Sequence, residues 1–115
     1  MTTEIIESND AYLDSVISLY TQLPDTPDKP SQNDRRTAAS FRAKDVPIQT
    51  VKAALILASV RRLARPDDAE PLPPVRSLAY FAPVVNELAV TPLNDDYVAY
   101  LCKKLQKLAN TCFHT

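Results

Sequence analysis

Glycine is missing from this chain of 115 residues, although the chain contains ten prolines. Glycine has no Cβ and therefore adopts left-handed backbone conformations that are costly for other residues. Its absence excludes a glycine-rich loop that cradles phosphate, and it makes two-residue β-hairpin turns unfavourable. The sequence therefore weighs against nucleotide hydrolysis by a P-loop and against a β-sheet fold.

Metal-binding and nucleophilic residues are scarce as well. His114 is the single histidine, and Cys102 and Cys112 lie ten residues apart without a CxxC spacing. The chain has too few histidines and cysteines for a His/Cys zinc site, and its single histidine is the only candidate base for a Ser-His-Asp triad. The acidic residues of 67–70 could hold a divalent ion, but neighbouring loop carboxylates usually face solvent. We expect no cofactor and no enzymatic activity.

The chain also lacks long apolar runs. No stretch approaches the ~18 consecutive apolar residues of a membrane span, and the N-terminus has no cationic segment followed by an apolar run. With 45% apolar and 23% charged residues, the chain is expected to fold as one domain over 1–115, with frayed ends at 1–8 and 111–115. A reduced, cytoplasmic protein without membrane contact is the simplest expectation.

The charges that are present form blocks. Residues 1–30 contain six acidic side chains and one basic, a net charge of −5. Residues 31–66 contain two acidic and eight basic side chains, a net charge of +6, and residues 67–115 have a net charge of −2. The overall charge of −1 therefore hides a positive middle segment, which is either a solvated pair of helix faces or a binding surface.

The first half of the chain predicts two helices around a proline-rich break. Residues 10–23 place apolar side chains on one face, with Asn9 or Asp10 as the N-cap. Three prolines within 24–30 end this helix. Ser31, with Asp34 three residues later, predicts the capping of a second helix. The inward face of the first helix consists of Tyr12, Val16, Leu19, Tyr20 and Leu23, and that of the second of Ala38 and Phe41.

The segment 48–63 predicts the central helix of the fold. It is apolar on nearly every side, and Pro47 suits the first helical position. Arg61, Arg62 and Arg65 lie at its C-terminal end, where the helix dipole favours cations by about 0.3–1 kcal/mol each. The same arginines could instead form a binding surface, together with Arg35, Arg42 and Arg76 from the flanking segments.

A proline-rich loop at 66–75 precedes a segment in which Pro83 interrupts the helical pattern. Either one helix kinks at Pro83, or Ser77 to Phe81 form a short turn and a helix begins at Ala82. The second alternative is favoured, with Val84, Val85 and Leu88 facing inward.

The last helix is predicted from the caps Asn94, Asp95 and Asp96 onward. Its expected buried face consists of Tyr97, Val98, Leu101, Leu105, Leu108 and Cys112, with the cysteines as small core side chains. The opposite face carries Tyr100, Lys103, Lys104 and Lys107. Such a stripe can stack a base while its ammonium groups meet phosphates, although it is more often a solvated helix face.

Two stretches carry a resemblance to a known type of module. The first is "VPIQTVKAALILASVRR", and the second is "PPVRSLAYFAPVVNEL". Together they resemble a helical module of bacterial mobile-element and DnaD-like replication proteins over about Ser31 to Leu88. One position departs from that pattern, because Asp45 stands where the module has glycine. The matching positions are Val46, Pro47, Ile48, Val51, Arg76, Ser77, Leu78, Tyr80, Phe81, Val85, Glu87 and Leu88. The resemblance implies an all-helical accessory domain that acts near DNA, through DNA or a replication partner, and has no catalytic residues.

These observations predict an all-α, compact bundle of about five helices with proline-rich connections. The predicted function is that of a non-catalytic accessory DNA-binding module of a bacterial replication or mobile-element system, with DNA, single- or double-stranded, as the partner. The alternative is an adaptor that binds a replication protein or another partner, and association between copies of the chain is left open. The predicted DNA-binding residues are Arg35, Arg42, Arg61, Arg62, Arg65, Arg76, Tyr100, Lys103, Lys104 and Lys107.

Overall fold

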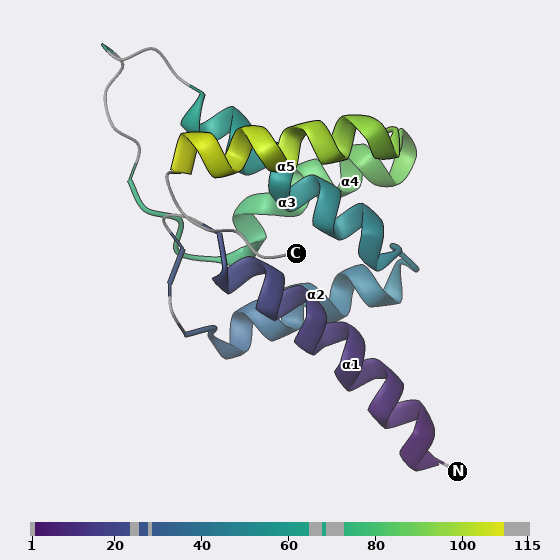
Figure 1. Ribbon diagram of the computed structural model, residues 1–115. Coiled ribbons are helices and arrows are strands. Elements are labelled where there is room, and N and C mark those ends of the chain that lie inside the picture. Colours follow the sequence, from purple (N-terminus) through teal and green to yellow (C-terminus); the bar gives the residue numbers. More distant parts are fainter. Residues whose placement is uncertain (1, 24–25, 28, 65–67, 69–72, 110–115) are drawn as a thin grey trace.

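The computed structural model describes residues 2–23, 26–27, 29–64, 68 and 73–109, and for residues 2–10 and 109 the backbone alone. All regular secondary structure in the described residues is helical, which confirms the all-α bundle of five helices (Figure 1). The helices are α1 (Thr2–Thr21), α2 (Gln32–Ala43), α3 (Ile48–Leu63), α4 (Ala82–Val90) and α5 (Asp95–Ala109), with a 3₁₀ turn η1 (Leu78–Phe81) before α4.

Helix α3 is the centre of the fold, as its all-round apolar sequence predicts. It contacts α1, η1, α4 and α5, and α1 pairs separately with α2. Ten of its sixteen residues are buried, including Leu55 and Ile56. Among the described side chains, it supplies more buried hydrophobic residues to the core than any other helix.

Helix α1 is longer than its apolar pattern predicts. It begins at Thr2, so that Asn9 and Asp10 lie inside the helix and neither is its N-cap. The segment 2–10 contains no proline or glycine to stop the helix, and the acidic residues Glu4 and Glu7 suit the positive end of the helix dipole. The N-terminal part of α1 projects beyond the other helices (Figure 1).

The turn from α2 to α3 contains a left-handed backbone position that usually requires glycine. The amide of Val46 donates to Phe41 O at 3.1 Å and that of Asp45 donates to Arg42 O at 3.0 Å, which is the Schellman arrangement of a helix end. Its left-handed position, normally glycine, is Asp45 with φ 58°. Aspartate is among the residues that tolerate this conformation, so the departure from the DnaD-like pattern at this position does not prevent a left-handed junction. Helix α3 then begins at Ile48, and Pro47, which was expected at the first helical position, is its N-cap.

Asp34 ties α2 to the segment before α4. The predicted capping box is present: the Ser31 side chain accepts from the Asp34 amide, and the Asp34 carboxylate accepts from the Ser31 amide at 2.9 Å. The second carboxylate oxygen accepts from the Leu78 amide, also at 2.9 Å, and Asp34 is buried. A residue predicted only as a cap therefore also positions η1, 44 residues away in the sequence.

The segment around Pro83 follows the favoured alternative. Ser77 caps η1 by accepting from the Ala79 amide, and α4 begins at Ala82 with Pro83 in its first turn, where the missing N–H removes no helical bond. Val85 and Leu88 are buried and Val84 is half-buried. The short helix therefore lies against α3 without a kink.

Candidate nucleic-acid interface

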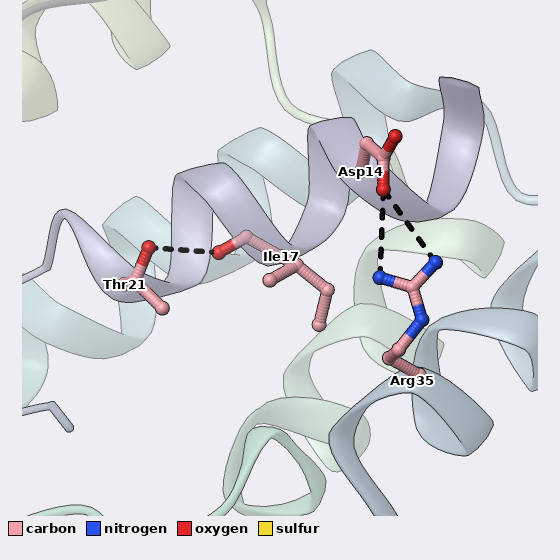
Figure 2. Close-up of polar contacts among 4 residues, drawn as sticks. All are labelled: Asp14, Ile17, Thr21 and Arg35. Carbon is pink, nitrogen blue, oxygen red and sulfur yellow. Dashed lines mark hydrogen bonds and ion pairs between the residues drawn. The ribbon is translucent and has the colours of Figure 1, made fainter. Parts of the chain in front are cut away.

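Arg35 and Arg42 lie on one face of α2, as their spacing predicts, and this face is turned toward α1. The Arg35 guanidinium is 3.4 Å from an Asp14 carboxylate oxygen of α1 (Figure 2). Arg42 lies 3.7 Å from Asp45 and 6.0 Å from the ring centroid of Tyr12 on α1. Both arginines are therefore engaged by acidic or aromatic groups of the chain itself.

Arg61 and Arg62 are sequence neighbours with different environments. Successive residues on an α-helix point about 100° apart, so the two side chains leave α3 in different directions. Arg61 is exposed and donates two hydrogen bonds to the Glu87 carboxylate of α4, at 3.3 and 3.1 Å. These bonds raise the pKa of Arg61 and lower the pKa of Glu87. Arg62 is only 9% exposed; it donates to the Pro73 carbonyl at 2.5 Å and lies 6.0 Å from the Tyr80 ring centroid.

The predicted convergence of six arginines into one patch is therefore not what the structure shows. Arg35 and Arg42 face α1, Arg61 faces α4, and Arg62 is packed inside. Arg76 is exposed, and Arg65 lies outside the described residues. Helix periodicity places side chains on faces, but it does not say which face the rest of the chain covers.

The buried face of α5 is narrower than predicted. Leu101 and Leu105 are buried, and Val98 and Cys102 are half-buried beside them. Tyr97 is 46% exposed and Leu108 is 39% exposed, so both were wrongly assigned to the core. The reason is that α5 packs mainly on α3, and a single neighbour covers only a narrow stripe. Cys112 lies outside the described residues.

The predicted aromatic and lysine stripe of α5 is accessible. Tyr100 is 54% exposed, Lys103 and Lys107 are exposed, and Lys104 is half-buried. Tyr97 joins the stripe: its ring is stacked on that of Tyr100, with centroids 6.0 Å apart and planes inclined by 22°. We call these five side chains the tyrosine–lysine face of α5. The spacing of Tyr97, Tyr100 and Lys104, at i, i+3 and i+7, is the signal that would have included Tyr97.

Tyr97 also connects this face to α3. Arg61 is held chiefly by Glu87, and the Tyr97 hydroxyl is close enough to act electrostatically in the same direction on the pKa of Arg61. The N-terminal end of the face is therefore bordered by an ion pair from two other helices. Asp95 and Asp96 of the first turn of α5 add negative charge at this end. Helix α5 is thus acidic in its first turn and basic toward its end, where the lysines of the face lie.

Two clefts lie elsewhere on the surface. One of about 530 Å³ is mostly apolar, and the other of about 180 Å³ lies between α3 and the start of α5. The larger cleft is lined by Arg62, Pro73, Pro74, Val75, Arg76, Ser77 and Tyr80. The smaller includes Lys52, which also acts on Cys102; burial raises the pKa of this thiol more than Lys52 lowers it.

No group of three or more metal-ligating side chains occurs in the part of the chain that the structure describes. Of the acidic residues of 67–70, Asp67 and Glu70 lie outside that part. None of the helices between residues 2 and 109 combines the length and apolarity that crossing a bilayer requires. Comparison of the chain with protein-family models, curated proteins and solved structures finds no match. The resemblance to DnaD-like modules therefore stays a prediction.

Proposed function

We propose that this chain is a non-catalytic accessory module of a bacterial replication or mobile-element system, and that it binds DNA through the tyrosine–lysine face of α5. The observation that carries the proposal is the exposed, stacked pair of Tyr97 and Tyr100 on the same helix flank as three lysines. Aromatic rings supply stacking area for bases, and ammonium groups meet phosphates and release their counterions. Reduced cytoplasm is the compartment that this function requires.

The arginines contribute unequally in this proposal. Arg76 is exposed and available for phosphate contacts. Arg35, Arg42 and Arg61 each face a carboxylate, and they would reach a phosphate only by exchanging that partner. Arg62 is held in the interior and is assigned to the fold rather than to the DNA. The lysines of α5 therefore take first place among the cations.

Salt dependence tests the proposal directly. Binding of labelled DNA, single- and double-stranded, is measured by fluorescence anisotropy at about 50 and about 200 mM salt. The double variant Lys103→Gln/Lys107→Gln should reduce the slope of log K against log salt by roughly 1.4–1.8, because two phosphate contacts are lost. The matched control is Lys29→Gln/Lys44→Gln, which removes two exposed lysines next to α2. Absence of binding at low salt, or equal loss in both variants, contradicts the proposal.

A substitution at Glu87 tests the proposal through an expected gain in DNA binding. Its carboxylate neutralises Arg61 at the edge of the face. Glu87→Gln keeps the shape of the side chain and removes the charge, so Arg61 becomes available and DNA binding should strengthen. Unchanged or weaker binding would remove Arg61 from the interface while leaving the lysines in place.

A second candidate function is an adaptor for another protein, favoured by the cleft of about 530 Å³ beside Tyr80. Its walls are mostly apolar, and Tyr80 is half-exposed at its side. Tyrosine and arginine next to an apolar cleft are typical of energetically dominant interface residues. A replication protein or other partner that is retained by the parent chain after nuclease treatment, and lost with Tyr80→Ala, would favour this function over DNA binding.

A further inference from the structure

The tyrosine–lysine face has two properties that bear on which form of DNA it takes. One is the ring pair of Tyr97 and Tyr100, which is stacked with its planes inclined by 22° and its centroids 6.0 Å apart. The second is the run of charge along α5, from Asp95 and Asp96 to Lys103 and Lys107. Both properties restrict the ligand beyond a general attraction for phosphate.

Ring stacking requires a base whose flat side is accessible. In a duplex each base is covered above and below by its neighbours, and the grooves expose base edges only. A single strand can turn an unpaired base onto an aromatic ring, and this contact tolerates every base because each has a π face. Tyr97 and Tyr100 are about half exposed on a helix flank, so they are accessible to an unstacked base.

The acidic N-terminal end of α5 is unfavourable for binding a DNA duplex. Helices that enter the major groove use their N-terminal residues to contact base edges, and in α5 these are Asp95 and Asp96. A duplex has one phosphate charge per ~1.7 Å, whereas one strand of it has one per ~3.4 Å. A rigid duplex lying along α5 would therefore bring phosphates close to the carboxylates. A flexible single strand can place its phosphates at the lysines alone.

The length of the face fits a short single-stranded segment. From Tyr100 to Lys107 the helix rises by about 10 Å, at ~1.5 Å per residue. That distance corresponds to about three nucleotides at the ~3.4 Å spacing that one strand has in a duplex, and to fewer in a strand that is extended by unstacking. The ring pair and the lysines therefore lie within reach of consecutive nucleotides.

We infer that the tyrosine–lysine face of α5 selects single-stranded over double-stranded DNA, with an unpaired base stacked on the Tyr97–Tyr100 pair and the neighbouring phosphates at Lys103 and Lys107. This inference rests on the proposed DNA binding and specifies its ligand. It assigns selectivity to the tyrosines and salt-dependent affinity to the lysines, and these two contributions can be separated by substitution.

The experiment compares oligothymidine of about 16 nucleotides, at the upper end of common single-strand site sizes, with a duplex of the same length. Anisotropy titrations at low salt should show the single strand bound at least about fivefold more tightly, as the stacking of one base predicts. Tyr100→Leu should weaken single-strand binding by about 5- to 150-fold and leave duplex binding unchanged. Tyr100→Phe, which keeps the ring, is the matched control and should bind like the parent.

The outcomes separate this inference from the proposed function. Duplex binding equal to or tighter than single-strand binding, with the lysine dependence intact, overturns the selectivity and leaves DNA binding standing. Binding of neither form overturns both. Equal weakening by Tyr100→Leu and Tyr100→Phe overturns the stacking contact, because only the hydroxyl would then matter. Thermal unfolding curves of all variants exclude a folding defect, which the exposure of Tyr100 makes unexpected.

Discussion

Helices α3 and α5 have similar lengths and both carry clustered cations, but the fold uses them in opposite ways. Helix α3 is surrounded by four other elements and buries ten of its sixteen residues. Helix α5 rests on α3, and Leu101 and Leu105 are the fully buried side chains among those described for it. The arginines at the end of α3 have partners within the chain, whereas Lys103 and Lys107 of α5 extend into water.

This comparison shows that a cluster of cations in the sequence is not by itself a binding surface. Arg61 and Arg62 are adjacent, yet one forms an exposed ion pair and the other is enclosed by Pro73 and Tyr80. A cation becomes available to a ligand where few elements pack around its helix. The packing of α5 leaves Lys103 and Lys107 accessible, whereas the packing of α3 brings Arg61 and Arg62 against partners in the chain.

The largest expected difference between the two helices is in core packing. Leu55 of α3 is 1% exposed, so Leu55→Ala should lower the free energy of unfolding by about 2–5 kcal/mol through lost burial and a residual cavity. Leu108→Ala in α5 is the matched control and should cost less than about 1 kcal/mol, because that side chain is 39% exposed. Urea denaturation with unchanged m-values measures both. Equal losses would contradict the distinction between the helices.

The second largest expected difference in stability is between substitutions of the neighbouring residues Arg61 and Arg62. Arg62→Met keeps much of the side-chain volume but removes a charged hydrogen bond to Pro73, which should cost about 1.5–3 kcal/mol. Arg61→Met removes an exposed ion pair, which should cost less than about 1 kcal/mol. Chemical denaturation of the two variants under the same conditions measures both losses of stability. A larger loss for Arg61 would reverse the assignment of interior and surface.

A smaller effect is expected from the helix caps. Helix α5 begins with the Asn94 side chain accepting from the Asp96 amide at 2.7 Å, whereas α3 has no side-chain cap and depends on packing. Asn94→Ala should therefore destabilise the protein by about 0.5–2 kcal/mol. Native-state hydrogen exchange should show this loss first in the amides of α5. Uniform acceleration across α3 and α5 would mean that the two helices open as one unit.

The smallest effect at neutral pH is expected at Tyr20, which packs edge-on against Phe81 in the core. Burial raises the pKa of Tyr20 to about 12, above the value near 10 of an exposed tyrosine, and Asp34 adds to the shift. The unfolded chain therefore loses this proton first, so the contribution of Tyr20 to stability is fully present below about pH 10 and is lost as the pH rises from about 10 to about 12.

Tyr20→Phe should remove the Tyr20 part of the alkaline loss of stability, while the raised pKa values of Tyr12 and Cys102 continue to contribute. It should cost little at pH 7, because the Tyr20 hydroxyl makes no hydrogen bond to any residue that the structure describes. Urea denaturation of parent and variant across this pH range measures the difference. A parallel decline of the two stabilities would assign the alkaline sensitivity to other groups.

The sequence predicted much of the fold because its signals are local. Proline positions, capping residues and apolar periodicity located α2, α3, α4 and the start of α5 to within a residue or two. The N-terminus of α1 was missed because Asn9 and Asp10 are good caps but not obligatory helix starts. Asp45 in a left-handed conformation was not predicted, since glycine is the usual signal for that position.

The candidate site was predicted less completely. Tyr100 and the three lysines of α5 were found from helical spacing alone, but Tyr97 was placed in the core and Arg62 on the surface. Each error concerns a side chain at the border of a helix face. Periodicity gives the direction of such a residue, and only the neighbouring elements decide whether anything covers it.

By itself, then, the sequence determined the number and kind of the helices, the central place of α3 and the local capping of α2, η1 and α5, because these depend on residues a few positions apart. The tertiary structure decided which cations and aromatic rings remain accessible, and it gave Asp34 a second bond to Leu78. These features depend on contacts between segments far apart in the chain. Burial and charge pairing arise only when those segments pack together, so no local pattern could specify them.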